Sequence, residues 1–549
     1  MRSSPEFGRP CSMKHRLYGS RWHGVAIGLL STFAGLATAE LIVGLVRGSA
    51  SPVVPVGQEV IDRVPKQVKD LAIEWFGSAD KAVLVVGTLL SLAVIGSIVG
   101  TLAVRGRRLN AYAVTVVVGV IGVFAVWMRP APDFGKMLPP IMGTLASIAV
   151  VWQLAPRQQR GELGEVPVAA EGGLARRGFV EGAAMVAAAS VLVGGVGRVL
   201  KRRFEVGDER AALELPKPVE VAPTLPTDGG ANDETATTAE GSKPMELDLE
   251  GLDPWLTSSQ DFYRIDTAIV VPQVPKDSWK LRVFGMVDLE LEITFADLLA
   301  RPMVERYVTL SCVSNEIGGD LVGNAKWQGV LLKDVLDEAG VQAGATQVVS
   351  RSIDGWSCGS PTSAIMDGRD AMLAVAMNGE PLPAEHGYPV RLVVPGLYGY
   401  VSATKWVTEI ELTRWEDFDG YWIPRGWSKE GPVKTMARID RPKKASGSRS
   451  KEGEPVDIAG LAWAVHRGIS RVEVQIDDGE WRHCDLAGVP SDDTWVQWVY
   501  RWIDASAGRH RVRARAYDGS REPQPSDPKG VAPNGAQGYH EVSFEVDEV

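Results

Sequence analysis

Cysteine is scarce in this sequence, and the residues present are far apart. The four cysteines, Cys11, Cys312, Cys358 and Cys484, form no C-x-x-C or C-x-x-C-H pair. This spacing excludes a zinc ribbon, a thioredoxin-like site and the attachment of a c-type haem. Four scattered cysteines are also too few for a disulfide scaffold. The sequence leaves open whether Cys312 and Cys358 form a single disulfide.

Positive charge is also in short supply. The formal net charge is −10, which argues against a nucleic-acid partner. The only histidines among the first 200 residues, His15 and His23, lie before or at the start of the first long apolar run. A haem b among those runs would therefore lack its usual ligand. No cytochrome b5-like domain is evident elsewhere in the sequence.

What the sequence has in abundance is apolar residues in its first 200 positions. Five runs reach the roughly 20 residues that a helix needs to cross a bilayer. They are Trp22–Val46, Ala82–Val104, Leu109–Met128, Leu138–Leu154 and Gly178–Leu200. Trp22, Trp127 and Trp152 lie near the ends of runs, where indole rings favour the membrane interface. We therefore expect an α-helical transmembrane region of five helices within residues 1–203.

Basic residues predict the orientation of these helices. They gather before the first run and after the second and fourth runs, for example at Arg16, Arg107 and Arg160. Because cytoplasmic loops are enriched in Lys and Arg, these segments are expected on the cytoplasmic side. An odd number of spans then places the rest of the chain outside, behind a multi-pass anchor in the cytoplasmic membrane. Lys201–Arg203 argue for the opposite orientation.

Residues 204–250 differ sharply from the apolar region before them. They contain 12 acidic and 3 basic side chains, and residues 205–250 contain no aromatic residue. Such a segment cannot bury enough apolar surface to offset its ordering entropy. We expect a disordered acidic linker that tethers the following domain.

From near Leu252 onward, the sequence has the pattern of a soluble α+β domain. Trp279–Val287 alternates as a strand does, and Val330–Ala339 has the pattern of an amphipathic helix. Val390–Pro395 is a buried-strand pattern that contains Arg391. Because a buried arginine is costly unless it is paired, Arg391 is expected to face an anion.

Several motifs in this domain resemble one family. They are Thr309-Leu-Ser-Cys-Val-Ser-Asn315, Lys326-Trp-Gln-Gly-Val-Leu-Leu332, Leu373-Ala-Val-Ala-Met-Asn-Gly-Glu-Pro-Leu-Pro383, His386-Gly-Tyr-Pro-Val-Arg-Leu-Val-Val-Pro-Gly396 and Lys405-Trp406. Their order resembles the molybdopterin domain of the sulfite-oxidase family over residues 255–415. The resemblance implies an oxidoreductase that binds molybdopterin (the molybdenum cofactor), with a catalytic domain at residues 251–430.

The resemblance also implies roles for individual residues. It implies that Cys312 is catalytic as the metal ligand, and a soft thiolate suits molybdenum bound by sulfur. It implies that four side chains bind the pterin and its phosphate: Arg264, His386, Arg391 and Lys405. Asp354 and Trp356 are expected to flank the substrate. Standing alone, each of the four pterin-binding candidates would be interpreted as a structural ion pair or a surface charge.

Some positions depart from the family pattern. Glu316 and Ile317 stand where sulfite oxidases carry arginines that bind sulfite. Trp356 replaces the active-site tyrosine, and Asp266 stands at a pterin-contacting histidine. At close range Glu316 would repel an anion. Sulfite is therefore not the expected substrate, and a neutral or cationic S- or N-oxide becomes competitive.

Residues 431–549 show short strands separated by turns. The Asp477-Asp-Gly-Glu480 segment is a hairpin signal. The pattern is typical of an all-β immunoglobulin-like sandwich. It resembles the dimerisation domain that follows the molybdopterin domain in the family, and a homodimer is implied by that resemblance.

Together these features predict a membrane-anchored enzyme that transfers an oxygen atom on a small-molecule or protein-borne S or N compound outside the cytoplasm. Its electron-transfer partner would be a quinone system or a cytochrome, because the sequence has no haem motif of its own. Two alternatives stay open. One is an S- or N-oxide reductase of the same fold, acting on a methionine-sulfoxide-like group. The other is a membrane-tethered binding protein without cofactor.

Arg176 and Arg177 before the fifth run admit two interpretations. They are either ordinary positive-inside charge or part of a twin-arginine (Tat) export signal. The second interpretation has a physical motive. A domain that folds around a cofactor made in the cytoplasm has to be exported folded.

Overall fold

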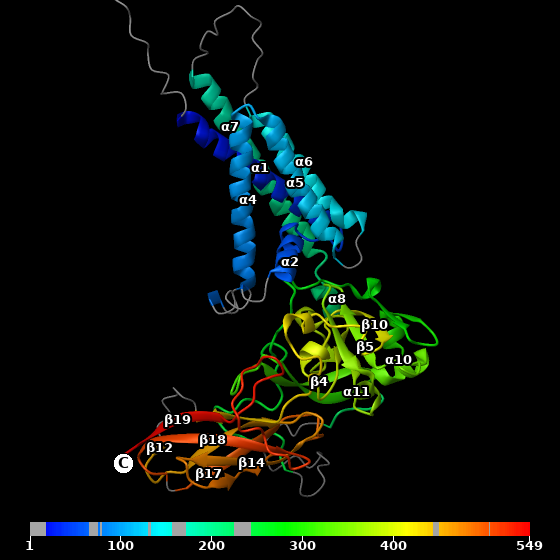
Figure 1. The fold of residues 1–549 in the computed structure, drawn as a ribbon, viewed down its shortest axis with the longest axis vertical. Helices are drawn as coiled ribbons and strands as arrows, with labels where there is room; N and C mark the ends of the chain where they lie inside the picture. Colours follow the sequence, from blue (N-terminus) through cyan, green and yellow to red (C-terminus); the bar gives the residue numbers. More distant parts are fainter. Residues whose placement is uncertain are drawn as a thin grey trace, which may run out of the picture. The chain divides into compact units, whose positions relative to one another are not determined.

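A computed structural model describes residues 18–64, 68, 75–76, 80–129, 133–155, 172–223, 243–442, 450–503 and 505–548. The chain divides into two compact units (Figure 1). The helical unit comprises Met1–Glu205 and Ala268–Val270. The β-rich unit comprises Val206–Thr267 and Val271–Val549.

Long helices build the helical unit. They are α1 (Tyr18–Leu45), α4 (Asp80–Val104), α5 (Arg108–Trp127), α6 (Phe134–Leu154) and α7 (Gly172–Arg202). By length and composition, all five could cross a membrane. Each coincides with one of the five predicted runs apart from its ends. The structure adds a short amphipathic helix, α2 (Val53–Arg63), that the sequence analysis did not predict.

The helices α1 and α4 cross where both carry glycines four residues apart. A Cβ on Gly28 of α1 would lie 1.9 Å from the backbone oxygen of Gly96 on α4. A Cβ on Gly100 of α4 would lie 2.0 Å from the backbone oxygen of Gly24. The two backbones approach this closely only because these positions have no side chain, as in other small-xxx-small helix pairs.

The first and last long helices, α1 and α7, run in the same direction. The rings of His23 and Phe179, near the starts of the two helices, are 5.0 Å apart. A Cβ on Gly44, near the end of α1, would lie 2.4 Å from the backbone oxygen of Gly197 on α7. This arrangement is compatible with the predicted odd number of spans.

Two sheets and three α-helices form the β-rich unit between residues 271 and 413. One sheet has the order β2-β1-β10-β5-β6, and the other has the order β3-β4-β7-β8 with β9 paired to β7. The strands are β1 (Lys280–Gly285), β2 (Leu291–Thr294), β3 (Val304–Ser311), β4 (Val322–Leu331), β5 (Gln347–Ser352), β6 (Ser357–Pro361), β7 (Met372–Met377), β8 (Glu380–Pro381), β9 (Arg391–Val393) and β10 (Val407–Thr413). The helices are α9 (Phe295–Leu299), α10 (Leu332–Ala339) and α11 (Thr362–Met366), with single 3-10 turns at η2 (Lys276–Ser278), η3 (Ala384–His386) and η4 (Gly399–Val401). The predicted α+β composition is confirmed.

Two further sheets follow the 3-10 turn η5 (Ile423–Arg425). Their orders are β11-β13-β17-β16 and β12-β19-β18-β14-β15. The strands are β11 (Met436–Arg441), β12 (Ser450–Lys451), β13 (Val456–Trp463), β14 (Ile469–Ile476), β15 (Trp481–His483), β16 (Asp485–Leu486), β17 (Val496–Trp502), β18 (Gly508–Asp518) and β19 (His540–Asp547). Ile458 and Trp498 of one sheet share a buried core with Val474 and Ala514 of the other. The alternating strands therefore bury one face each, as predicted for an all-β region.

The segment expected to be a disordered linker is folded in part. Helix α8 (Gly207–Ala211) lies at its start, where the phenol of Tyr388 donates to Glu209 Oε1 (2.8 Å). The Val219 amide donates to the Met303 carbonyl (2.8 Å). At the other end of the segment, the Leu247 amide donates to Gln497 Oε1 (2.6 Å). The expectation is therefore wrong for residues 206–223 and 243–250, because partners distant in sequence satisfy their backbone groups; residues 224–242 lie outside the described residues.

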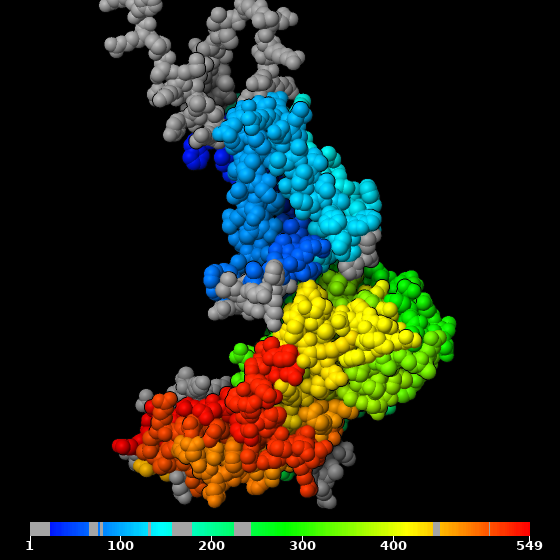
Figure 2. Space-filling model, viewed as in Figure 1, coloured from blue at the N-terminus to red at the C-terminus, as the bar shows by residue number. Residues whose placement is uncertain are grey.

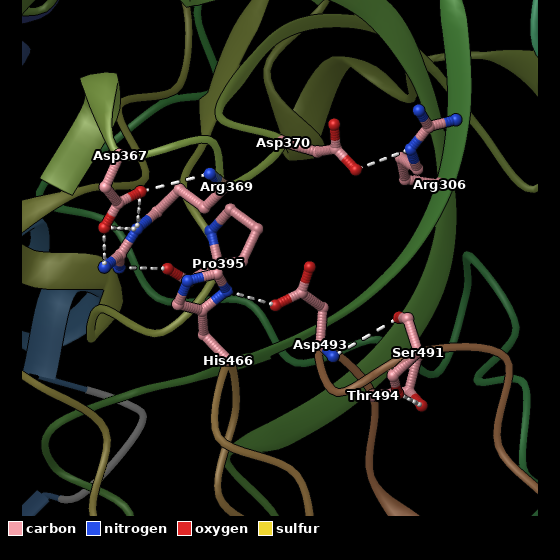
Figure 3. A network of polar contacts seen from close by, with 9 residues as sticks. All are labelled: Arg306, Asp367, Arg369, Asp370, Pro395, His466, Ser491, Asp493 and Thr494. Atoms are coloured by element: carbon pink, nitrogen blue, oxygen red, sulfur yellow. Dashed lines mark hydrogen bonds and ion pairs between the residues drawn. The ribbon is translucent and has the colours of Figure 1, made fainter.

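Polar contacts gather on both sides of the boundary between the two parts of the β-rich unit (Figure 3). His466 Nδ1 lies 3.0 Å from Asp493 Oδ1, and the Asp493 carbonyl accepts from the Thr309 amide of β3 (2.9 Å). Nearby, Arg369 pairs with Asp367 and donates to the Pro395 carbonyl (2.8 Å) just after β9. The Thr309–Asp493 bond ties β3 to the C-terminal part, whereas the Arg369 contacts hold the segment after β9 within its own part.

A second junction centres on the buried side chain of Arg438. Its guanidinium lies 2.6 Å from Asp440 Oδ1 and 2.5 Å from Asp253 Oδ2. It also donates to the Gly319 carbonyl (3.1 Å), in the loop that follows Cys312. Arg438 and Asp440 are each only 6% exposed, and burial raises the pKa of the Asp440 carboxyl.

Replacing Arg438 with methionine is expected to lower the free energy of unfolding by about 3–5 kcal/mol, because it leaves the Asp440 carboxylate buried without its cation. Thermal unfolding of the full chain, followed by tryptophan fluorescence, measures the change. Arg282→Met is the matched control. Its pair with Glu290 is half exposed on both sides, so its loss is expected to cost about 0–1 kcal/mol. Equal effects of the two variants would contradict a structural role for the Arg438 junction.

Candidate active site

A cavity opens in the β-rich unit where the loops after β3, β5 and β9 meet. Its volume is about 870 Å³ including its open mouth. Six of the seven predicted site residues line it: Cys312, Asp354, Trp356, His386, Arg391 and Lys405. The fold thus brings together side chains that are far apart in the sequence.

Cys312 follows the last residue of β3 and is 7% exposed. Its backbone is fixed by the amide donating to the Leu321 carbonyl (2.9 Å). Its Sγ accepts from the Ser314 amide (3.4 Å). Burial raises the pKa of the thiol, and the Ser314 hydrogen bond opposes this shift. A cationic or metal partner would therefore be needed to hold the buried sulfur as a thiolate.

Cys358 forms no disulfide with Cys312, since both are free thiols. The Cys358 sulfur lies 3.2 Å from Ser350 Oγ and 3.3 Å from Thr404 Oγ1, away from the cavity lining. Burial raises the pKa of its thiol to about 11. Cys358 is thus a small buried side chain, and the disulfide left open by the sequence is excluded.

Arg391 is the first residue of β9, and its guanidinium stacks over the Trp327 ring at 4.8 Å. It donates to the His386 carbonyl (3.3 Å), but its buried Nε has no hydrogen-bond partner. Within the part of the chain that the structure describes, no carboxylate pairs with it. Burial lowers the pKa of Arg391 to about 10. A buried, unpaired cation that lines a cavity indicates an anionic ligand.

Lys405 and Arg264 share one carboxylate. Asp266 Oδ2 lies 2.7 Å from Lys405 Nζ and 2.9 Å from Arg264 Nε. Burial lowers the pKa of Lys405 to about 8, against the effect of Asp266. Arg264 is not among the lining residues, although Asp266 is, and the Arg264 side chain is 42% exposed. The structure therefore places Arg264 behind Asp266 rather than on the cavity wall.

His386 is a neutral cavity residue. Its Nε2 lies 2.9 Å from the Ser259 carbonyl, which fixes the orientation of the ring. Burial lowers its pKa to about 4, and the charges of Arg391 and Lys405 act in the same direction. Because Nε2 donates to this carbonyl, the neutral ring leaves Nδ1 to accept a hydrogen bond from a ligand and adds no positive charge.

Asp354 and Trp356 lie together in the turn between β5 and β6. The Asp354 carboxylate accepts from the Trp356 amide (3.1 Å), and both side chains line the cavity. Burial raises the pKa of the Asp354 carboxyl, and Asp266 raises it further. The turn needs Gly355 at its centre, where φ is +94°, a conformation that glycine adopts readily.

The structure adds Tyr263, which the sequence analysis missed. Its ring stacks on Phe262 at 5.2 Å and lines the cavity. Among the described residues, its hydroxyl has no hydrogen-bond partner. Burial raises the pKa of the phenol, with further effects from Cys312 and Arg391, so the hydroxyl stays protonated. Its position next to Arg264, a predicted pterin-binding residue, was the only available signal.

Three aromatic side chains, named here the aromatic wall, were also missed. The rings of Trp422 and Trp427 are 6.4 Å apart, and Tyr400 lies 5.9 Å from Trp427. All three line the cavity. They come from η4 and from the segment around η5 that leads to the C-terminal sheets. An aromatic surface of this kind favours an uncharged or sulfur-containing group.

The expectation that Glu316 repels an anion at the site is wrong. The Glu316 side chain is exposed and is not among the residues that line the cavity. It therefore gives no ground for excluding an anion. The loop after Cys312 turns away from the cavity at this point, and the Arg438 junction holds its Gly319 carbonyl.

The donor set fits a molybdopterin. In the described part of the chain, no group of three or more His, Cys, Asp or Glu side chains could hold a metal ion. A metal beside Cys312 would thus need sulfur ligands from a cofactor, which a dithiolene supplies. The unpaired Arg391 fits the anionic end of the pterin.

Comparisons with known proteins agree with this geometry. Residues 268–422 match a family described as "Oxidoreductase molybdopterin binding domain". An "Uncharacterized oxidoreductase YuiH" of Bacillus subtilis is 37% identical over 153 residues, which are 28% of this chain and 74% of that protein. A sulfite oxidase of Gallus gallus is 30% identical over 341 residues, which cover 53% of this chain and 71% of the relative.

A solved structure also resembles the chain. The sulfane dehydrogenase SoxCD from Paracoccus pantotrophus is 24% identical, with a TM-score of 0.46 over 54% of this chain and 84% of that one. The sequence relatives establish the family, since the match to the avian enzyme extends over most of its length. The chain belongs to the sulfite-oxidase family and is a molybdopterin-binding oxidoreductase.

Proposed function

We propose that this oxidoreductase carries out two-electron oxygen-atom transfer on a sulfur compound, with Cys312 as the protein ligand of the metal. The observation that carries the proposal is the free Cys312 thiol lining the same cavity as the unpaired Arg391. The Cys312 thiol supports a sulfur ligand at the cavity wall. The Arg391 guanidinium supplies the positive charge that an anionic cofactor needs.

The other side chains have separate tasks in this proposal. Arg391 and Lys405 bind the anionic part of the pterin, and His386 orients it through a neutral ring. Arg264 contributes through Asp266, whose Oδ2 it shares with Lys405. When bound, the cofactor supplies the redox chemistry, and the protein positions and tunes it.

The substrate side is proposed to lie near Asp354, Trp356 and the aromatic wall. The buried Asp354 carboxyl, whose pKa is raised, can take or give a proton. Reduction of an S- or N-oxide is the second candidate, favoured by the aromatic wall, which suits an uncharged organic group better than an inorganic anion.

Steady-state assays in both directions test the proposal. Purified full-length protein with one molybdenum per chain is expected to oxidise a sulfur compound with an artificial electron acceptor. Reduction of sulfoxides with an artificial donor, at a higher kcat/KM, would favour the second candidate. Protein that carries molybdenum but is inactive in both directions would contradict both.

Replacing Tyr263 with phenylalanine is expected to lower kcat by about 10- to 100-fold, because the site loses a hydroxyl donor that lines the cavity and has no partner among the described residues. Molybdenum content and thermal stability should stay unchanged. Tyr398→Phe serves as the control, since its hydroxyl accepts from the Lys434 amide (3.3 Å) and does not line the cavity. A Tyr263→Phe enzyme with wild-type kcat would exclude the hydroxyl from the reaction.

We further propose that the helical unit anchors the enzyme as a multi-pass protein of the cytoplasmic membrane, with the β-rich unit outside. The five long apolar helices and the parallel course of α1 and α7 support this topology. A twin-arginine signal at Arg176 and Arg177 is part of the same proposal. Alkaline-phosphatase fusions at residue 430 should be active if the unit is exported, and inactive if the orientation is reversed.

The remaining assignments concern partners. A quinone system or a cytochrome would exchange electrons with the enzyme, because the sequence contains no haem motif. Residues 431–549 are proposed to form an immunoglobulin-like sandwich that pairs two chains, on the support of their two packed sheets. Analytical ultracentrifugation of detergent-solubilised protein would distinguish a dimer from a monomer.

A further inference from the structure

A second cavity lies within the helical unit. Its volume is about 1110 Å³ including its open part, and residues of α1, α2, α4, α5 and α6 line it. The surface is hollowed between α4 and the neighbouring helices in the space-filling view (Figure 2). The cavity is therefore a partly open space between helices, which a ligand can enter from outside the bundle.

The lining of this cavity carries no charge. It consists of apolar side chains, glycines, two prolines of α6 and seven hydroxyl-bearing residues. The seven are Ser31, Thr32, Thr88, Ser91, Thr115, Thr144 and Ser147. A cavity lined by uncharged residues from several helices offers no partner for an ionised group.

Each of these seven hydroxyls already donates a hydrogen bond to a backbone carbonyl. Six donate to a carbonyl one turn earlier in the same helix, as Thr88 does to Leu84 (2.9 Å) and Thr115 to Ala111 (3.0 Å). The seventh, Ser147, donates across to the Ser31 carbonyl of α1 (2.9 Å). No side-chain donor in the lining is therefore left for a polar ligand, and an apolar cavity does not hold ordered water.

Helix α2 forms one end of the cavity through Val53 and Val56. One turn further on, Glu59 and Asp62 both pair with Arg129, which follows α5. This ion cluster ties α2 to the end of α5, so the end wall of the cavity is fixed.

We propose that this cavity binds a long hydrocarbon chain, either the acyl chain of a membrane lipid or the isoprenoid chain of a quinone. The inference rests on the proposed membrane anchoring. Contact with an apolar lining is the only attraction that the cavity offers, and a hydrocarbon chain gains most from it. The polar group of the ligand stays outside, where charges and water are available.

Filling the cavity tests the inference in the full-length protein. Thr88→Phe on α4 and Val118→Phe on α5 place a ring in the lining. Leu90→Phe and Val117→Phe are the matched controls on the same two helices, since these side chains are 62% and 57% exposed and do not line the cavity. Each protein is extracted from membranes, washed extensively in detergent and analysed by native mass spectrometry, and its organic extract by liquid chromatography–mass spectrometry.

The wild type and the controls are expected to keep a bound lipid or quinone, and the filled variants to keep about ten-fold less. The extract identifies the source as a phospholipid or an isoprenoid quinone, and either agrees with the proposal. Equal retention in all proteins, or none in the wild type, would overturn it. Release of the protein from the membrane by salt or alkali alone would instead contradict the proposed membrane anchoring. This outcome separates a failure of the anchoring from a failure of the cavity site.

A measurement on the wild type covers the case in which the filled variants do not fold. A fatty acid that carries a diazirine at mid-chain is incorporated into phospholipid nanodiscs with the protein and photolysed. Crosslinks at lining residues of α1, such as Leu36, which survive washing before photolysis, support the cavity site. Crosslinks confined to outward residues such as Leu90 and Val120 would refute it.

Discussion

Replacing Cys312 with serine is expected to lower turnover on the order of 10³-fold or more, which corresponds to about 4 kcal/mol of activation free energy. The reason is the loss of the protein's sulfur ligand, since an oxygen ligand is harder and matches a sulfur-bound metal poorly. Molybdenum content should fall less than turnover does, because Arg391, Lys405 and His386 are intact. Inductively coupled plasma mass spectrometry and steady-state kinetics measure the two quantities on the same preparation.

Cys358→Ser is the matched control for this experiment. Cys358 is also a buried free thiol of the same unit, but it lies against Ser350 and Thr404 rather than on the cavity. Its replacement should leave turnover near the wild-type value. A Cys312→Ser enzyme that keeps its turnover, or a Cys358→Ser enzyme that loses as much, would remove Cys312 from the metal.

Replacing Arg391 with methionine is expected to lower retention of the pterin and to raise the stability of the cofactor-free protein. Retention of the pterin should fall on the order of 10- to 100-fold, because a charge-assisted hydrogen bond to an anion is lost. The cofactor-free protein should become more stable by about 1 kcal/mol or more, because a buried cation without a carboxylate partner is removed. A merely structural arginine would lower stability on removal, so the sign separates the two roles.

The pterin is quantified by its fluorescence after oxidation, and stability by thermal unfolding of protein made without the cofactor. Arg351→Met is the control, since Arg351 lies beside Glu411 and Glu409 and does not line the cavity. It should leave pterin content unchanged and lower stability slightly. Loss of stability in cofactor-free Arg391→Met protein would contradict the assignment of this cation to a ligand.

Much of the helical unit was predictable because local properties determine it. A run of about 20 apolar residues has few alternatives to a membrane-length helix, and the five predicted runs coincide with the long helices. Helix α2 was not predicted, since its 11 residues include Pro55 and mix polar with apolar side chains. The crossing glycines became meaningful only once Gly28 and Gly96 were known to face each other.

In the β-rich unit, the sequence predicted which residues gather at the site but not how they pair. Six predicted residues line one cavity, whereas Arg264 lies behind Asp266 because of an ion pair that no local pattern reveals. The linker at residues 204–250, which its composition predicts to be disordered, is folded in part. The reason is that it bonds to residues such as Met303 and Gln497, which lie far away in the sequence. Tyr263 and Trp427 were missed for the same reason: their role depends on a cavity built from distant segments.

The two junctions bear on the order in which the enzyme is made. The strand that leads to Cys312 is bonded to the backbone of Asp493, and the loop after Cys312 is bonded to Arg438. Trp427, a wall of the cavity, also lies beyond residue 413. The binding cavity is thus incomplete on a nascent chain that has emerged only as far as β10. Cofactor loading is therefore expected only after the segments that carry Trp427, Arg438 and Asp493 have been synthesised and folded.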